Sequence, residues 1–199
     1  MRLLAALMAV AVLVRAEVTF LETFDAGWED RWVVSSAVED QGAVVVRTPA
    51  ESGGDVNALI FTEKAKHYAL AAPFPAPVGL NTHDFTFQYE VKLTEGLECG
   101  GAYVKLLTAE DGLDLAALGA DTGYTIMFGP DRCGATNKVH MILRLVNPLT
   151  GEMDEHHLTD PPAARLDSVV HLYTATLRRD NTVTDAVDGE VEREGSLRE

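Results

Sequence analysis

Two side chains near the middle of the chain have the types and spacing of a sugar-binding surface. In the run CGGAYVKLL, Tyr103 and Lys105 alternate with Ala102, Val104 and Leu106. Alternation with a period of two sends the two sets to opposite faces of a strand, so the apolar set faces a core and the other set faces water. A sugar ring packs on an aromatic face, and an ammonium donates hydrogen bonds to hydroxyls. The spacing alone leaves the alternative open, which is an ordinary solvated sheet face.

The two cysteines of the chain, Cys99 and Cys133, bracket this segment. A disulfide between them would close a loop of about 35 residues and contribute roughly 3–4 kcal/mol in the chain-entropy model. The run YTIMFG, inside the same loop, contains Tyr124 and Met127. Strict alternation places these two side chains on opposite faces, so both serve one site only if the strand ends or bulges between them. The alternative for Met127 is core filling.

The acidic run EMDEHH at 152–157 raises two other chemistries, and the spacing disfavours both. Jelly-roll glycoside hydrolases use correctly spaced carboxylates in an E-x-D-x-E arrangement. Here Glu152 and Asp154 are followed by His156 where the second acid is needed. A metal site is disfavoured because His156 and His157 are consecutive and point apart in a strand. We therefore predict a protein that is not an enzyme, in which Glu155 either accepts hydroxyl hydrogen bonds or is an exposed loop carboxylate.

Length and charge limit the classes of partner. The chain has 199 residues, enough for one well-packed domain, and a formal net charge of −15. Such a charge repels nucleic acid and anionic lipid headgroups and tends to attract cations. Most of the excess carboxylates are nevertheless expected to form a solvated surface.

Residues 1–16, MRLLAALMAVAVLVRA, are predicted to be a signal peptide. Arg2 gives a positive start, an unbroken apolar run follows, and Ala16 fits the small-residue cleavage pattern, so the mature chain begins near Glu17. The apolar run is short for a membrane span, and an uncleaved anchor is the alternative. Entry into the secretory pathway places the two cysteines in an oxidising compartment, which favours a disulfide between them.

Many short alternating runs separated by turn residues predict an all-β sandwich. The clearest is FTFQYEVKL at 85–93, and KVHMILRLV at 138–146 alternates in the same way. The segment 171–187 reads as two strands joined at Asp180-Asn181, a favoured turn pair. Long helical periodicity and internal repeats are absent from the sequence.

Three segments have ambiguous patterns. We predict extended structure for EKAKHYALAA at 63–72, because it runs into the prolines of PFPAP. Trp28 and Trp32 are four residues apart, which fits one helical turn, but we favour tryptophans that anchor on a sheet. The long connection at 108–123 is predicted to hold one helical turn near Leu113–Leu118.

Taken together, these runs resemble the calnexin/calreticulin family of ER lectin chaperones. The likeness lies in ECGGAYVKLL, GYTIMFGPDRCG, KVHMILRLVNPLTGEMDEHH, HLYTATLRRDNT, KAKHYALAA and the N-terminal FLETF, so it extends over nearly all of residues 17–199. The pattern CGG-x-YVKL followed by Y-x-IMFGPD-x-CG is very specific. The sequence GGAYVKLL and the NPLTG insert are more similar to calnexin than to calreticulin.

The resemblance implies a concanavalin/legume-lectin-like jelly-roll β-sandwich with a structural calcium ion. It implies a calcium-dependent lectin chaperone in the ER lumen that binds monoglucosylated N-glycans on unfolded glycoproteins. Matched residue by residue, the carbohydrate contacts are Tyr103, Lys105, Tyr124, Met127 and Glu155. The matched calcium ligands are Thr23, Asp55, Val56 and Asn57. Backbone oxygens can serve as such ligands, so side-chain identity is a weak test. The family's disulfide matches Cys99–Cys133.

The resemblance also implies parts that this chain does not contain. The family inserts a proline-rich arm, which recruits thiol oxidoreductases and prolyl isomerases, after the segment that matches GSLRE. The closing strand and helix of the lectin domain, with one acidic glycan ligand and the best calcium carboxylate, also lie beyond Glu199. We therefore expect an N-terminal portion of a lectin domain, membrane-anchored only if a calnexin-like chain continues. The alternative is an interaction or structural module without glycan binding.

Overall fold

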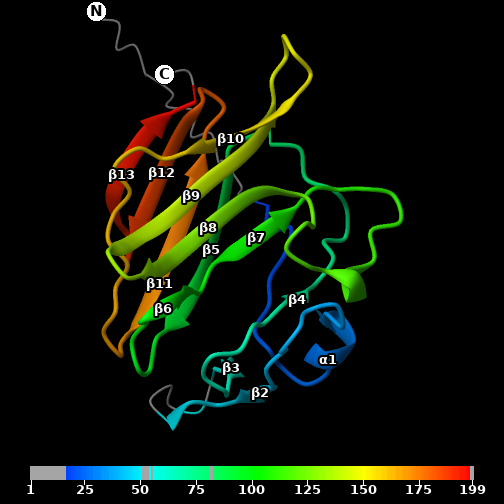
Figure 1. Cartoon of the computed structure of the whole chain (residues 1–199), viewed down its shortest axis with the longest axis vertical. Coiled ribbons are helices and arrows are strands. Elements are labelled where there is room, and N and C mark those ends of the chain that lie inside the picture. Colours follow the sequence, from blue (N-terminus) through cyan, green and yellow to red (C-terminus); the bar gives the residue numbers. More distant parts are fainter. Residues whose placement is uncertain (1–16, 51–53, 55, 81–82, 198–199) are drawn as a thin grey trace, which may run out of the picture.

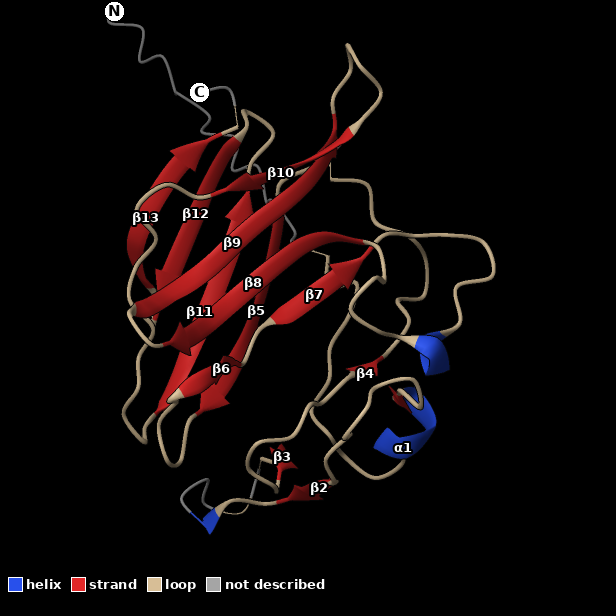
Figure 2. Ribbon diagram, viewed as in Figure 1, coloured by secondary structure: helices blue, strands red, loops and turns tan. Residues whose placement is uncertain are grey.

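Two large antiparallel sheets pack face to face, and two small strand pairs lie beside them (Figures 1 and 2). This computed structural model describes residues 17–50, 54, 56–80 and 83–197. The predicted signal peptide and the predicted calcium ligand Asp55 lie outside the described residues. The architecture confirms the predicted all-β sandwich.

The first large sheet has five strands in the order β10-β9-β8-β6, with β7 also paired to β8. The strands are β6 (Cys99–Gly101), β7 (Val104–Leu107), β8 (Tyr124–Cys133), β9 (Thr136–Val146) and β10 (Met153–His157). The predicted alternation of β9 is confirmed, because Val139, Met141 and Leu143 are at most 2% exposed. A long hairpin joins β9 to β10 and projects from the body of the molecule (Figure 1).

The second large sheet has four strands in the order β13-β12-β11-β5. They are β5 (Phe85–Lys92), β11 (Val170–Leu177), β12 (Thr182–Val187) and β13 (Glu190–Ser196). The predicted turn between β11 and β12 is confirmed, and Asn181 there has a φ of 74°, a left-handed value that asparagine tolerates. Sequence reading missed β13 because its run EVEREGS has no apolar alternation, as is common for a charged edge strand.

The core lies between the two large sheets. Its fully or nearly fully buried members are Ile126, Phe128, Val139, Met141, Leu143, Tyr173, Ala175, Leu177, Val183 and Val187. Phe128 makes edge-to-face contacts with Phe87 and Tyr89 of the opposite sheet, at ring-centroid distances of 5.3 and 6.4 Å. Burial of each large apolar side chain contributes roughly 1.5–3 kcal/mol, so this layer holds the two sheets together.

The N-terminal segment adds small elements at one side of the sandwich (Figure 1). They are α1 (Trp28–Arg31), β1 (Val33–Val34), β2 (Val44–Arg47), β3 (Ala58–Phe61) and β4 (Leu70–Ala71). β1 pairs with β4, and β2 pairs with β3. The prediction of extended structure for residues 63–72 is confirmed only in part, because β4 and an isolated bridge at His67 lie there, whereas residues 64–65 form a turn.

The prediction that Trp28 and Trp32 anchor on a sheet is wrong. The two residues span one helical turn, in which the Trp32 amide donates to the Trp28 carbonyl at 3.0 Å. The Trp32 ring lies against Phe20 and Phe24, with ring centroids 6.4 and 5.8 Å away, and its Nε1 donates to Glu22 at 2.9 Å. A local aromatic cluster therefore replaces the expected sheet contact.

The connection between β7 and β8 holds the predicted helical turn as a short 3₁₀ helix, η2 (Leu115–Ala117). The Asp114 carboxylate caps it by accepting from the Ala116 amide at 2.9 Å. The Ser35 hydroxyl donates to the Leu118 carbonyl at 2.6 Å, which ties this connection to the N-terminal segment. Within the described residues, no helix is both long enough and apolar enough to cross a membrane.

Candidate functional site

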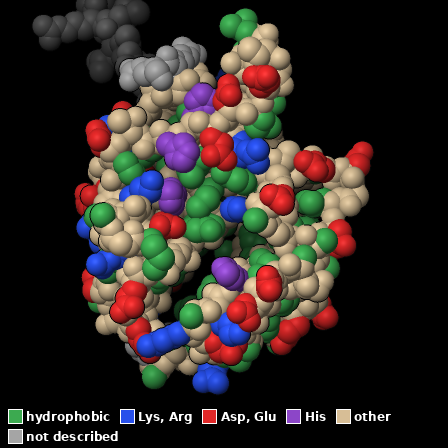
Figure 3. Space-filling view, in the orientation of Figure 1, with side chains coloured by type: hydrophobic (Ala, Val, Ile, Leu, Met, Phe, Trp, Pro, Cys, Tyr) green, Lys and Arg blue, Asp and Glu red, His purple; other side chains and the backbone are tan. Residues whose placement is uncertain are grey.

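The outer face of the five-stranded sheet gathers side chains that the sequence predicted to bind a glycan. The register pairs Lys105 with Met127, Met127 with Ile142, and Ile142 with His157. Directly opposite residues of an antiparallel pair project to the same face, so these four form a row across four strands. In Figure 3, hydrophobic side chains lie in the middle of this face, with histidine, acidic and basic side chains around them.

A register shift brings Tyr124 onto the same face as Met127. Leu106 pairs with Ile126, whereas Leu107 pairs with Tyr124, so β8 contributes one extra residue between the two pairs. Such an irregularity breaks the strict alternation of side chains along the strand. The sequence required the strand to end or bulge between Tyr124 and Met127 if both side chains serve one site. This register shift supplies that irregularity.

Tyr124 is the centre of a compact polar cluster. Its hydroxyl donates to Glu155 Oε1 at 2.7 Å. Its ring centroid lies 4.8 Å from Lys105 Nζ and 5.1 Å from Arg144 Cζ, distances at which a cation is attracted to the ring. Arg144 Nε lies 3.7 Å from Glu155 Oε1 and has no hydrogen-bond acceptor among the described residues. Two cations and one carboxylate thus surround a single tyrosine.

The hydrogen bond from Tyr124 to Glu155 fixes which group is neutral and which is charged. Burial raises the pKa of Tyr124 to about 12, and the bond to Glu155 acts in the same direction. The same bond lowers the pKa of Glu155. At neutral pH the phenol is therefore a neutral donor and the carboxylate is ionised. Because the Glu155 side chain is 46% exposed, it keeps acceptor positions for a ligand hydroxyl.

Tyr103 lies at a break between β6 and β7, where the sequence predicted one continuous strand. A Cβ on residue 101 would overlap the Tyr103 ring, so the glycine at this position leaves the space that the ring occupies. The break is fixed from the opposite sheet, because the Tyr89 hydroxyl donates to the Ala102 carbonyl at 2.7 Å. Tyr103 remains 41% exposed, so its ring is accessible on the surface.

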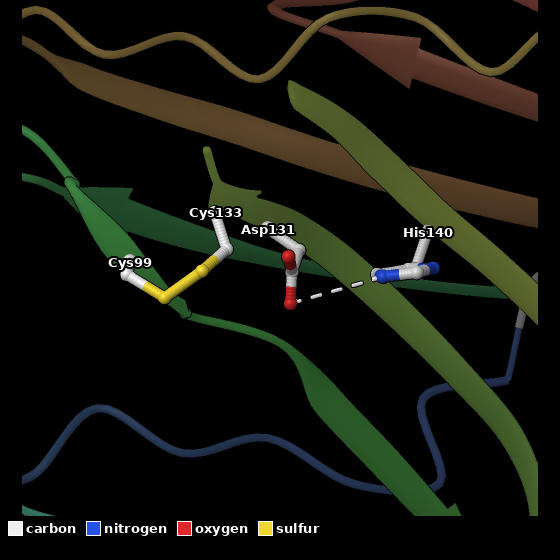
Figure 4. Close-up of a disulfide and its surroundings, with 4 residues drawn as sticks. All are labelled: Cys99, Asp131, Cys133 and His140. Atoms are coloured by element: carbon white, nitrogen blue, oxygen red, sulfur yellow. Dashed lines mark ion pairs between the residues drawn. A yellow bond between two sulfur atoms is a disulfide. The ribbon is translucent and has the colours of Figure 1, made fainter. Parts of the chain in front are cut away.

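Sequence reading overlooked three further polar residues of this face, Asp131, His140 and Arg144. The alternation of residues 138–146 already placed His140 and Arg144 opposite the core side, and that was the usable signal. Asp131 of β8 and His140 of β9 point toward each other, with 3.8 Å between Oδ2 and Nε2 (Figure 4). Burial lowers the pKa of His140, so its imidazole is neutral at neutral pH.

Cys99 and Cys133 form a disulfide, as predicted (Figure 4). They lie directly opposite each other where β6 pairs with β8. The bond attaches the short strand β6 to the end of β8. It therefore stabilises the edge of the sheet that leads into Tyr103.

Two segments predicted to hold calcium lie next to each other. The Asn57 side-chain amide donates to the Phe24 carbonyl at 3.0 Å, which places Thr23 beside the start of β3. The Asn57 Oδ1 accepts from the Thr48 hydroxyl at 2.8 Å. No group of three or more His, Cys, Asp or Glu side chains suited to a metal ion occurs in the described part of the chain.

The comparisons with known proteins agree with this architecture. The calreticulin family model matches residues 20–199. A calnexin homolog of Pisum sativum is 44% identical over 179 residues, covering 89% of this chain and 32% of the relative. Calnexin homolog 2 of Arabidopsis thaliana is 45% identical, covering 88% and 33%. The globular domain of T. cruzi calreticulin has a TM-score of 0.80 at 32% identity, covering 92% of this chain and 66% of that chain.

The chain spans about a third of the length of the curated relatives that it matches. The family match nevertheless covers nearly all of the described residues. On these grounds the chain belongs to the calreticulin family.

Proposed function

We propose that this chain is the N-terminal part of the lectin domain of an ER chaperone that binds monoglucosylated N-glycans on unfolded glycoproteins and assists their folding. The observation that carries the proposal is the cluster in which Tyr124 donates to Glu155 beside Lys105. The calnexin and calreticulin names of the similar proteins support the same conclusion.

In this proposal a hexose makes three kinds of contact. The exposed Tyr103 ring offers an aromatic surface for the apolar face of the sugar. Lys105 supplies donors and Glu155 supplies acceptors for hydroxyls, and both are fixed by their contacts to Tyr124. Met127 has an unbranched thioether side chain that adapts to the shape of a bound ring. Binding therefore requires orientation of hydroxyls more than burial of a large apolar surface.

Family membership supports proposals about calcium, location and partners. The calreticulin family binds calcium, and we propose that Thr23, Asp55, Val56 and Asn57 supply oxygens to it here. Calnexin homologues are ER proteins, and we propose the ER lumen for this chain. Recruitment of thiol oxidoreductases requires a proline-rich arm downstream. Members of the calreticulin family are chaperones and not enzymes, which confirms the prediction of a non-enzymatic protein.

The test compares Lys105→Ala and Tyr103→Ala with the wild-type chain, using calorimetry with monoglucosylated and unglucosylated high-mannose glycans. Each substitution removes an oriented contact to the sugar, so the binding free energy should weaken by about 1–3 kcal/mol. Both side chains face outward, so the thermal midpoint should change little. If Lys105→Ala binds normally, this strand is not the lectin site.

Val104→Ala is the matched control on the same strand. Val104 pairs with the buried Phe128 and faces the core, so this substitution should lower stability. A wild-type chain that folds and binds neither glycan would show that residues 17–199 do not form a lectin on their own.

A further inference from the structure

A carboxylic acid lies inside the core of the four-stranded sheet. Asp185 is on β12 and is 0% exposed. The register pairs it with Ala175 of β11, a member of the core, so its side chain projects to the core side. Val183 and Val187, two residues away on either side, also face the core. Asp185 therefore occupies a position where the pattern of the strand calls for an apolar residue.

Both oxygens of the Asp185 side chain lack a hydrogen-bond partner among the described residues. Transfer of an unpaired ionised carboxylate into an apolar interior is far more unfavourable than transfer of the neutral acid. The buried site therefore favours the protonated form of Asp185 and resists ionisation of this carboxyl group.

The neighbouring elements do not supply a compensating charge. Tyr89 of β5 and Tyr173 of β11 are neutral phenols whose pKa values are raised, mainly by burial and further by the charge of Asp185. Glu192 of β13 is an acid and disfavours a second negative charge. The core-facing side chains of β8 and β9 in this cluster are apolar.

The basic residue opposite Asp185 in the strand register is directed elsewhere. Arg193 of β13 is the cross-strand partner of Asp185. Its Nε donates to the Thr159 carbonyl at 2.8 Å, and its guanidinium lies 3.6 Å from the Asp160 carboxylate. These contacts hold Arg193 at the edge of the sheet and leave Asp185 unpaired.

We propose that Asp185 links folding of this domain to proton uptake, so that ionisation of this one buried acid loosens β12 and β13. The inference concerns the four-stranded sheet and goes beyond glycan binding on the other sheet. In agreement with the geometry, burial raises the pKa of Asp185 to about 7, and Glu192 acts in the same direction.

The direction of the pH effect follows from linkage. An unfolded aspartate titrates near pH 3.9. The stabilisation from protonated Asp185 is thus fully present below about pH 4 and is lost as the pH rises to about 7, with up to about a tenfold fall in the folding equilibrium constant per pH unit. His171, between Asp188 and Asp167, also has a raised pKa and acts in the same direction at higher pH.

The experiment is urea unfolding of the whole chain at pH 5, 6 and 7, for the wild type and Asp185→Asn. The ratio of the two folding equilibrium constants, wild type over variant, should fall by up to about 100-fold from pH 5 to pH 7. His171 is present in both proteins, so its effect on the two folding equilibrium constants cancels in their ratio. Asp180→Asn is the control, because Asp180 is exposed and has a lowered pKa. The ratio of folding equilibrium constants, wild type over Asp180→Asn, should therefore not fall between pH 5 and pH 7. A constant ratio for Asp185→Asn would overturn the proposal.

A second measurement decides the matter if Asp185→Asn fails to fold. Carbon-13 NMR of the wild-type chain follows the Asp185 carboxyl shift directly as the pH changes. A midpoint near pH 7 is expected, and a midpoint near pH 4 would overturn the proposal. Amide hydrogen exchange, corrected for intrinsic rates, should show faster opening of β12 and β13 above that midpoint than below it.

Discussion

Glu155 and Asp185 are carboxylates in the two large sheets, and their surroundings shift their pKa values in opposite directions. Glu155 lies on the outer face of the five-stranded sheet, where the Tyr124 hydroxyl lowers its pKa. Asp185 lies on the core side of the four-stranded sheet, where burial raises its pKa. The contrast shows that a hydrogen-bond donor and access to water, rather than residue type, decide the charge of an acid in this fold.

The largest effect is expected where the two sheets meet. Gly129→Ala would place a Cβ onto the Tyr89 hydroxyl and force a side chain into a backbone with a φ of 136°. Overpacking and backbone strain together should lower the free energy of unfolding by about 4 kcal/mol. Urea unfolding measures this loss, and it should weaken both sheets because Tyr89 contacts both.

Gly134→Ala separates the two causes. Gly134 has a φ of 58°, but an added Cβ there meets no atom within 4 Å. It should therefore lower stability by only about 1 kcal/mol, the cost of the backbone conformation. Equal losses for the two alanine variants would show that Tyr89 moves aside and that the steric argument is wrong.

Removal of the disulfide should affect one sheet alone. A double variant, Cys99→Ser with Cys133→Ser, opens a link between residues 34 apart in sequence. The loss of stability should be about 3 kcal/mol, observed as a lower thermal midpoint. The pH dependence assigned to Asp185 should persist, because that residue lies in the other sheet. A double variant that melts like the wild type would show that β6 is held by strand pairing alone.

Tyr124→Phe keeps the ring beside Lys105 and Arg144 but removes the donor to Glu155. We expect a loss of stability of about 1 kcal/mol and a rise in the pKa of Glu155, followed by carbon-13 NMR of its carboxyl group. Tyr68→Phe is the control, because its hydroxyl donates to the Glu63 carbonyl outside this site. If the pKa of Glu155 does not rise in Tyr124→Phe, that hydroxyl is not its main partner.

The smallest effect is expected from Glu155→Gln. The folded-state pKa of Glu155 is lowered, so its stabilisation is present above its unfolded pKa of about 4.3 and is lost as the pH falls through the folded value. The thermal midpoint of the wild type should therefore fall slightly more than that of the variant between pH 6 and pH 3.5. This slope is opposite in sign to the one expected for Asp185. Slopes of the same sign would remove the contrast between the two acids.

The fold could be predicted largely from alternation, because each sheet has one buried face and a shift by one residue would expose it. Residues 85–93 and 138–146 show this clearly. The tryptophan pair could not be assigned in this way, because a spacing of four fits a helical turn and the deciding contacts are with Phe20 and Phe24. β13 was missed because an edge strand buries too little to leave an apolar pattern.

The arrangement of the candidate site could be predicted from the sequence only in part. Tyr103 and Lys105 follow from strand alternation and the family resemblance, and Met127 follows from the resemblance alone. The arrival of Tyr124 on the face of Met127 depends on a register shift that arises only when β7 and β8 pair. Asp185 shows an available signal that was overlooked. In TVTDAV, Asp185 lies two residues from both Val183 and Val187 and so shares their face of the strand, which already places an acid on the apolar side.

The disulfide leaves the chain without a free thiol in the described residues, since both of its cysteines are bonded. The tip of the β9–β10 hairpin projects from the molecule, and Leu149 there is 94% exposed (Figure 1). Leu149→Cys would therefore introduce a single reactive position for a maleimide dye. Because β10 also carries Glu155, the fluorescence anisotropy of that dye would report on hairpin motion when a sugar is added.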